Sequence, residues 1–360
     1  MMLTIHTLFN DPNIVNAVIQ RVLQTRKDAI YWQQYLDFRR TTTRVFKDYI
    51  GQVTGVMAGS INSRYGEKPI RERQNIGSGY GEIAYLGDRY QISIDRLSEL
   101  QDLIDKFNEA KTADQVTAMQ DIVNFIYDDY RQVLLAAHKR MDIVVGSLLM
   151  TGKAQVKNKD DNAAGIDLLD IELPFKFITP EAGDKANFIT YLQQKINELR
   201  SIYGVFPKMI MSRGTFVKNI IGSSEFGDKF KMQLTGNEMY MSTGLITSQL
   251  ASTVFTGIGL PAIEIKEDYV LDQSGKNVQI YADNRITLIP QDKIGYMRFH
   301  TPYEAVDGVP GRNYTQADGD MLISGYKDGN GRYLEYTAEW LPQITNPNLI
   351  VNFDLSTMNA

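Results

Sequence analysis

The stretch that decides the fold is Thr112–Gly152, TADQVTAMQDIVNFIYDDYRQVLLAAHKRMDIVVGSLLMTG. It has no proline, and its first glycine is Gly146. Apolar residues recur along it in steps of three or four: Val116, Met119, Val123, Ile126, Tyr130, Val133, Ala137, Met141, Val144 and Leu148. This period predicts one continuous helix over 112–150, about 38 residues and about 57 Å long, ended by Gly152. A helix several times longer than the globular average indicates a rigid scaffold across which other elements lie.

The predicted start of this helix is marked by Thr112 and Gln115, which have capping-box spacing. A coiled-coil seam is the other ordinary use of so long a helix. It would require a stricter heptad than the steps of three and four found here, so we favour the scaffold.

The residues before the long helix show two different sequence patterns, one helical and one β-prone. Helical spacing of apolar residues from Ile14 to Leu23, continued by Ile30, Tyr31, Tyr35 and Phe38, predicts an N-terminal helical arm over 1–43. From 44 to 95, β-prone residues and eight glycines predict a long two-stranded excursion.

The residues after the long helix predict a compact α/β block and closing strands. The block has an amphipathic helix from Phe188 to Ile202 ended by Gly204, a buried strand over 205–212, a helix over 215–221 and several strands over 254–289. A hairpin with its tip at 328–331 then joins strands, with Tyr333–Trp340 and Leu349–Leu355 as the last two.

Composition excludes several classes of protein. The 360 residues carry a net charge of −5, which argues against a protein that coats nucleic acid. The absence of cysteine excludes disulfides, thiol nucleophiles and cysteine-ligated metals. We expect neither a signal peptide nor a membrane span, because Met1–Phe9 has no basic segment and the densest apolar stretch is only 143–150.

No constellation for catalysis, cofactor binding or metal binding is found in the sequence. The three histidines, at 6, 138 and 300, are far apart along the chain. The glycine-rich stretch Gly77–Gly81 fails the dinucleotide fingerprint, because Glu82 and the residues after it do not begin a helix, so we interpret it as a β-tip. Asp128 and Asp129 are adjacent on a predicted helix and therefore point about 100° apart, unlike a facing acid–base pair.

Charge is unevenly distributed along the first third of the chain. Residues 39–73 have a net charge of +5, and residues 74–130 a net charge of −7. One interpretation is that both are simply solvated faces. The other is that a basic β-arm of one subunit lies on the acidic start of the long helix of the next, a heterologous contact that propagates around a ring. The predicted contact residues are Arg64, Lys68, Arg71, Arg73, Asp114, Asp121, Asp128 and Asp129.

The order of these elements resembles the major capsid proteins of tailed bacteriophages with the Hong Kong 97 (HK97)-like fold, and within them the phage lambda major capsid protein family. The residues that carry the resemblance are short motifs in a fixed order: RYQISID (89–95), RMDIVVGSLLMTG (140–152), VFPKMIMSRGTF (205–216) and Ile286–Pro290 followed by Gly295-Tyr296. In this family a long helix ends in an apolar stretch and a turn, and a buried strand leads into a helix.

The resemblance implies an α+β, HK97-like capsid fold. Residues 1–43 would be the N-terminal arm and 44–95 the extended loop. Residues 96–184 would form the peripheral domain with spine helix 112–150, residues 185–290 the axial domain, and 291–360 the remainder of the peripheral domain.

The resemblance also implies a function and partners. The expected protein is structural, not an enzyme, and assembles with itself into hexamers and pentamers of an icosahedral shell that encloses double-stranded DNA without sequence-specific binding. Expected partners are a scaffolding protein, a portal, a maturation protease and a decoration protein, with no membrane. Expected locations are the virion and, during assembly, the host cytoplasm.

Two alternatives stay open at the level of sequence. An encapsulin-type nanocompartment has the same fold and encloses an enzyme cargo instead of DNA. An α/β enzyme with a site in 185–290 belongs to a different class, and a polar residue essential for activity would be needed to support it.

Overall fold

The computed structural model describes residues 2–26, 30–51, 76–111, 113–157, 167–223, 225–226, 247–271, 275–329 and 331–358. The chain divides into two compact units. The first comprises Met1–Phe46, Gly81–Asp142 and Tyr296–Gln343, and the second comprises Lys47–Tyr80, Ile143–Gly295 and Ile344–Ala360. Each unit is described below by itself.

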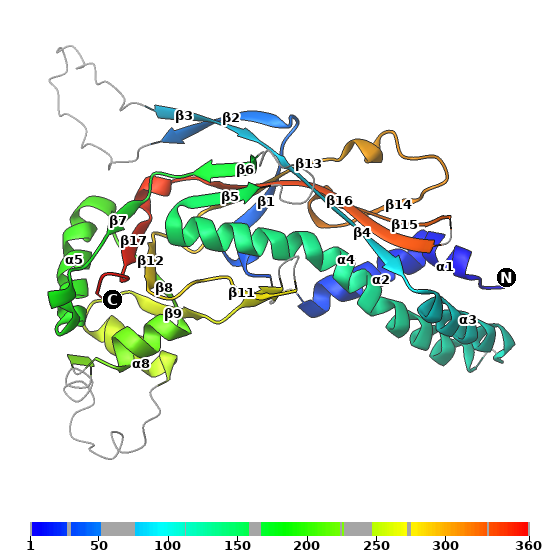
Figure 1. Ribbon diagram of the computed structural model, residues 1–360, viewed down its shortest axis with the longest axis horizontal. Helices are drawn as coiled ribbons and strands as arrows, with labels where there is room; N and C mark the ends of the chain where they lie inside the picture. The colour runs from blue at the N-terminus through cyan, green and yellow to red at the C-terminus, as the bar shows by residue number, and fades with distance from the viewer. Residues whose placement is uncertain are drawn as a thin grey trace, which may run out of the picture. The chain divides into compact units, whose positions relative to one another are not determined.

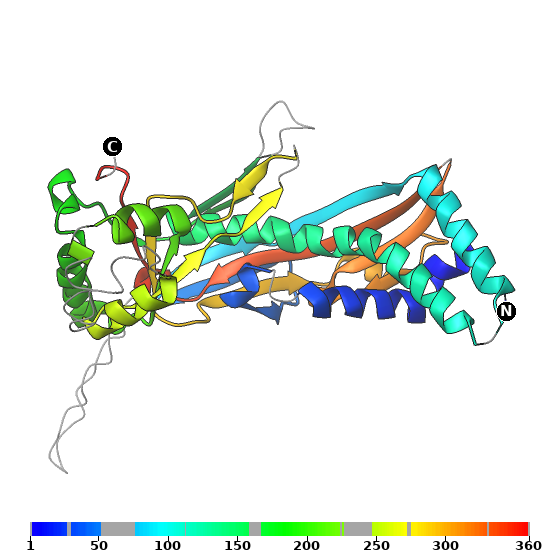
Figure 2. The ribbon, with the colours of Figure 1, turned by 90° about the horizontal axis from the view of Figure 1, so that it is seen from below.

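The long helix is confirmed. Helix α4 spans Gln115–Thr151, 37 residues, and is the long helix seen in both ribbon views (Figures 1 and 2). It begins three residues later than predicted, and Thr112 lies outside the described residues. Gly152 ends it in the left-handed region at φ 68°, where a Cβ would also come within 2.9 Å of the Leu173 carbonyl oxygen.

A six-stranded sheet forms the centre of the first unit. Its order is β1 (Leu36–Arg40), β13 (Gly295–His300), β16 (Gly331–Ile344), β15 (Leu322–Asp328) and β14 (Tyr314–Gln316), and β4 (Ala84–Ile92) pairs with β16. β15 and β16 form the predicted hairpin, with Asp328 opposite Gly331. β4 runs antiparallel to β16 from Arg332↔Ile92 to Trp340↔Ala84.

The N-terminal segment is helical over only part of the predicted arm. α1 (Ile5–Asn10) is capped by Thr4, and α2 (Pro12–Arg26) buries Val15, Val18, Ile19 and Val22. The prediction that the helical arm continues through Phe38 was wrong, since Trp32–Gln34 form the 3-10 turn η2 and 36–40 form β1. There, pairing with β13 outweighs the helical spacing of the apolar residues, and the side chains of β1 alternate between the two faces of the sheet.

In the described part of the predicted excursion, β2 (Val45–Gly51) and β3 (Ile76–Glu82) pair as a two-stranded ribbon. The Gly77–Gly81 stretch lies within β3 and not at a tip, so that interpretation was wrong. β4 follows directly, and no helix begins there, in agreement with the rejected dinucleotide fingerprint.

Sequence reasoning missed helix α3, Ile94–Glu109. Ser93 caps it by accepting a hydrogen bond from the Arg96 N–H, and Leu100 and Ile104 are buried. The signal was present, since Ser93 precedes apolar residues at Leu97, Leu100 and Ile104 with helical spacing.

The second unit is built on a five-stranded sheet. Its order is β7 (Lys176–Ile178), β17 (Val351–Asp354), β12 (Arg285–Ile289), β8 (Lys208–Ser212) and β9 (Ala262–Lys266). β12 is antiparallel to both neighbours, while β8–β9 and β17–β7 are parallel pairs. The predicted strand over 205–212 is therefore confirmed from Lys208, in the interior of the sheet.

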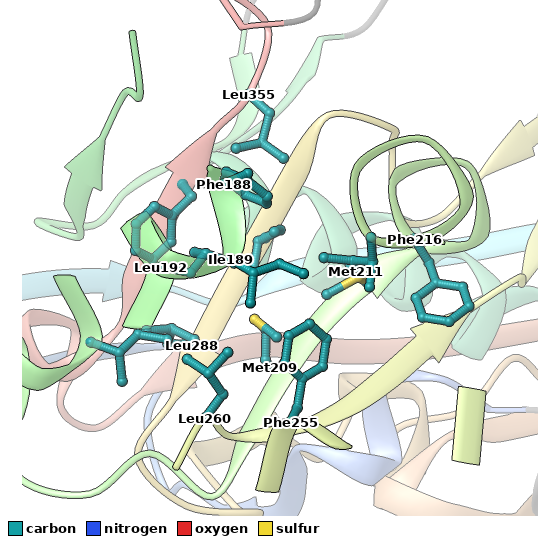
Figure 3. Packing of buried hydrophobic residues seen from close by; sticks show 14 of the residues in the cluster. Phe188, Ile189, Leu192, Met209, Met211, Phe216, Phe255, Leu260, Leu288 and Leu355 are labelled. Atoms are coloured by element: carbon teal, nitrogen blue, oxygen red, sulfur yellow. The ribbon is translucent and has the colours of Figure 1, made fainter. Parts of the chain in front are cut away.

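Helices α5 (Phe188–Tyr203) and α8 (Ser248–Gly257) supply apolar side chains to the core of this unit (Figure 3). Phe188, Ile189 and Leu192 of α5 meet Met209 of β8 and Leu288 of β12. α5 ends at Gly204 as predicted. Val254, predicted to begin the strands, lies in α8 instead. α6 (Arg213–Thr215) and the π-helical turn η4 (Phe216–Ile221) occupy the predicted helix over 215–221.

Two further ribbons belong to the second unit, β5 (Lys153–Lys157) with β6 (Asp167–Glu172) and β10 (Tyr269–Leu271) with β11 (Asn277–Gln279). Ile280, directly after β11, approaches the last turns of α4. A Cβ on Gly146 would lie 2.5 Å from the Ile280 carbonyl oxygen. Glycine is therefore required at 146 by the closeness of this backbone.

Candidate intersubunit surface

The four predicted acidic contacts lie on the first turns of α4 and just before it. α3 leads into this region, and the Leu3 N–H and carbonyl are hydrogen-bonded to the Asn108 side chain at its end. Among the described residues, the four carboxylates differ in whether they form ion pairs within the subunit.

Asp129 is engaged within the subunit. The Nε of Arg96 on α3 lies 2.9 Å from both carboxylate oxygens, and the same guanidinium donates to the Phe125 carbonyl at 2.7 Å and stacks 4.3 Å from the Phe125 ring centroid. Burial raises the pKa of Asp129, and the charge of Arg96 acts in the opposite direction. Asp129 therefore ties α3 to α4 and has little capacity left for a second subunit.

Asp128 is more available. Its side chain is 65% exposed, and its ion pair with Arg131 is long, at 3.7 Å. Asp128, Arg131, Gln132, Arg96 and Asp129 line an open depression of about 490 Å³. A cationic side chain entering this depression would meet Asp128 first, because Arg96 already occupies Asp129.

Asp114 and Asp121 are exposed, and the described part of the chain provides no ion pair for either. Along α3, further acidic residues are also exposed: Asp95, Glu99, Asp102, Asp105 and Glu109. We define the acidic surface as these five residues together with Asp114, Asp121 and Asp128. Sequence reasoning missed the five on α3 as contacts, because it did not predict that helix.

The basic half of the predicted contact is not described. Arg64, Lys68, Arg71 and Arg73 lie outside the described residues, so their contact with the acidic surface stays a prediction. Of the other positive residues in the stretch, Arg44 is already paired with Glu339, at 2.5 Å.

Chemistry of other kinds has little support in the described part of the chain. Those residues contain no group of three or more histidine, aspartate or glutamate side chains arranged to hold a metal ion. None of the described helices is long and apolar enough to span a membrane. His300 contacts Glu339 at 2.8 Å, and the neighbouring Thr301 donates a hydrogen bond to Asp320. The sequence analysis assigned no role to His300 or Glu339.

No protein-family model and no curated protein matches the chain. Solved structures do match. A crystal structure of a prophage protein from Escherichia coli CFT073, assigned as a capsid protein, has a TM-score of 0.58 and 12% identity, covering 96% of this chain and 99% of its own.

Two further structures resemble the chain at lower TM-scores. A phage-related protein from Bordetella bronchiseptica RB50 has a TM-score of 0.48 and 8% identity, covering 96% of this chain and 98% of its own. The capsid of the Myoviridae phage XM1 has 0.43 and 9%, with 90% and 91% covered. Both scores are below 0.5, so the fold assignment rests on the prophage protein. The chain therefore has the α+β, HK97-like capsid-protein fold that the order of its elements predicted.

Proposed function

We propose that the protein is the major capsid protein of a tailed phage. It assembles with itself into hexamers and pentamers of an icosahedral head shell that encloses double-stranded DNA. The observation that carries this proposal is the match to a prophage capsid fold over 96% of the chain, with almost none of the other protein left uncovered. Fold alone does not specify function, so the proposal also draws on the surface described above.

The acidic surface supports self-assembly. Eight exposed carboxylates on α3, α4 and the turn between them repel one another, and a solvated surface of this kind gains from contact with a cationic partner. The basic segment of a second copy, with Arg64, Lys68, Arg71 and Arg73, supplies that chemistry. Such a contact is heterologous and closes into a ring of subunits.

The proposal assigns roles to the parts of the chain. Residues 44–95 are the extended loop, α4 is the spine of the peripheral domain, and 185–290 is the axial domain at the centre of hexamers and pentamers. A scaffolding protein, a portal, a maturation protease and a decoration protein are the proposed partners. The proposed locations are the host cytoplasm during assembly and the virion afterwards.

Negative-stain microscopy with mass determination tests the function. The purified chain is examined alone and together with a candidate scaffolding protein. Shells, tubes or hexameric rings support the proposal. A monomer of about 41 kDa under every condition contradicts it. Shells that enclose an enzyme cargo and no DNA indicate an encapsulin-type compartment instead.

The charge contact is tested separately. Changing both Arg71 and Arg73 to Glu is expected to impair assembly, and Asp121→Lys in the same chain is expected to restore part of it. Asp121 is the better rescue position than Asp129, because Asp129 is held by Arg96. Asp129→Lys serves as the matched control that fails to rescue. Normal assembly of the double Glu variant would remove this contact from the proposal.

A further inference from the structure

His138 lies at the centre of a buried aromatic cluster in the first unit. Its side chain is 0% exposed. The ring stacks on Trp32 with centroids 5.8 Å apart and planes at 9°, and it lies 4.8 Å from Trp340 and 6.4 Å from Phe38. Three separate elements, η2, β1 and β16, therefore contact the same imidazole on α4.

Neither ring nitrogen of His138 has a hydrogen-bond partner among the residues that the structure describes. A neutral imidazole tolerates this environment, because the cost of an unpaired polar atom is modest compared with that of a buried charge. An imidazolium would have two N–H donors and a full charge with nothing to accept either. Burial accordingly lowers the pKa of His138 to about 3, and the positive charge of Lys139 acts in the same direction.

In the described part of the chain, no carboxylate is hydrogen-bonded to the ring. η2, β1 and β16 contribute Trp32, Phe38 and Trp340. The 3-10 turn η7 (Asp318–Asp320) reaches the cluster through Gly319, which accepts from Trp340 Nε1. Its Asp320 pairs with Arg40, and Asp318 has its own interaction. On α4, Asp142 accepts from the Trp32 N–H at 2.9 Å and from Lys139 at 3.0 Å.

The segment that contacts His138 can leave without dismantling the sheet. β1 lies at the edge of the six-stranded sheet, where β13 is its strand neighbour. Opening of residues 30–40 breaks the pairing of β1 with β13, the Trp32–Asp142 bond, the contacts of Arg40 with Asp320 and Thr301, and the aromatic contacts, while the pairing of β16 with β15 and β4 is retained. Opening also exposes the buried side chains of Tyr31, Trp32 and Tyr35, so a neutral His138 keeps the segment closed, and the cost of burying a charged imidazole acts in the opposite direction.

We propose that His138 makes the packing of residues 30–40 against α4 and β16 acid-labile. When the imidazole takes up a proton, this segment opens and the rest of the first unit stays folded. The proposal is independent of the capsid function, because it depends only on contacts within one chain.

The two tryptophans of the chain, Trp32 and Trp340, both flank His138, so tryptophan fluorescence excited selectively over the tyrosines reports on this cluster. The full-length protein is titrated from pH 8 to pH 3.5, and amide exchange of peptides over 30–40 is measured in parallel, corrected for the intrinsic effect of pH. We expect a reversible fluorescence change, with the ratio of open to closed segment rising about tenfold per pH unit below about 6.5.

His138→Phe is expected to lose this pH dependence, since the phenyl ring fills the same space and takes up no proton. His6→Gln and His300→Gln, the other two histidines, are the controls and keep it. An unchanged profile in His138→Phe overturns the proposal. So does exchange over β15 and β16 that rises together with that of 30–40, because opening is then not local.

A second measurement needs no variant, in case His138→Phe does not fold. In wild-type protein labelled with ¹⁵N-histidine, the ring nitrogens of His138 are expected to stay neutral until the fluorescence transition and to become protonated within it. Protonation near pH 6.5 with no change in fluorescence would contradict the proposal.

Discussion

The two halves of α4 share one helix and have opposite surroundings. In the half from Gln115 to Tyr130, only a stripe of Ile122, Ile126 and Tyr130 is buried, and the exposed residues are Val116, Thr117, Gln120, Asp121, Asn124 and Asp128. From Val133 onward the helix is buried on nearly every side, at Val133, Leu134, Leu135, Ala137, His138, Met141, Asp142, Val144, Val145, Leu148, Leu149 and Met150. A helix that is apolar all round is a core element, whereas an amphipathic one presents a surface.

This difference teaches where substitutions matter for folding and where they matter for assembly. In the buried half, each side chain is constrained by contacts at van der Waals distance. In the exposed half, Asp114 (just before it), Asp121 and Asp128 are free to vary as far as folding is concerned and are available for contact with another subunit, whereas Asp129 is held by Arg96. The predictions below run from the largest expected effect to the smallest.

The largest effect concerns His138 in the buried half. The unfolded chain takes up a proton near pH 6.5 and the folded chain near pH 3, so the folded state is penalised as pH falls between these values. From pH 7 to pH 4 this group is expected to lower the free energy of unfolding by about 3 kcal/mol. Urea unfolding of wild type and His138→Phe at both pH values measures it. Equal losses in the two proteins would contradict the assignment.

Gly146→Ala is expected to destabilise the second unit by about 2 kcal/mol, because its Cβ would meet the Ile280 backbone at 2.5 Å. Helix propensity alone predicts a gain of about 1 kcal/mol. Thermal unfolding distinguishes the two signs. Gly183→Ala is the matched control, since a Cβ there meets nothing within 4 Å and little change is expected. Stabilisation by Gly146→Ala would show that α4 is not held this closely.

Arg96→Ala tests Asp129, the aspartate of the exposed half that is paired within the subunit. Removing the guanidinium breaks the pair with Asp129 and the bond to the Phe125 carbonyl, and we expect a loss of about 1 kcal/mol. Arg131→Ala is the control, because its contact with Asp128 is long and exposed. Chemical denaturation of both variants measures the difference, and equal stabilities would contradict a role for Arg96 in holding α3 to α4.

Asp121→Asn is expected to change the free energy of unfolding by less than about 0.5 kcal/mol, because its carboxylate is exposed. The same substitution is expected to slow assembly, most clearly at low salt, where exposed charges are least screened. Light scattering during assembly at two salt concentrations gives the result. A large loss of stability with unchanged assembly would reverse the comparison between the two halves.

Much of the fold was predictable because its signals are local. The steps of three and four from Val116 to Leu148 predicted α4, and Gly152 and Gly204 marked helix ends that the structure confirms. The Asp328–Gly331 hairpin was predicted from turn chemistry for the same reason. α3 has an equally local signal in its Ser93 cap, but the predicted excursion over 44–95 overlaps the start of this helix, so the helix was missed.

Other features depended on partners distant in sequence. The helical spacing through Phe38 gave way to β1, since pairing with β13 lies some 260 residues away along the chain. The start of α5 is capped by Glu225, whose carboxylate accepts from the Ile189 and Thr190 N–H groups, a contact that no local pattern contains. The availability of Asp128 and Asp121, against the engagement of Asp129, likewise depends on where α3 places Arg96.

By itself, the sequence determined the long helix, its end, the order of elements and the charge split between 39–73 and 74–130, because helical period, turn residues and charge are properties of neighbouring residues. Only the tertiary structure decided that Trp32, Phe38 and Trp340 enclose His138. It also decided that Gly146 contacts Ile280 and that Arg96 pairs with Asp129. Each of these is a contact between residues far apart in the chain. Burial and hydrogen bonding there are set by packing, which residue order alone does not specify.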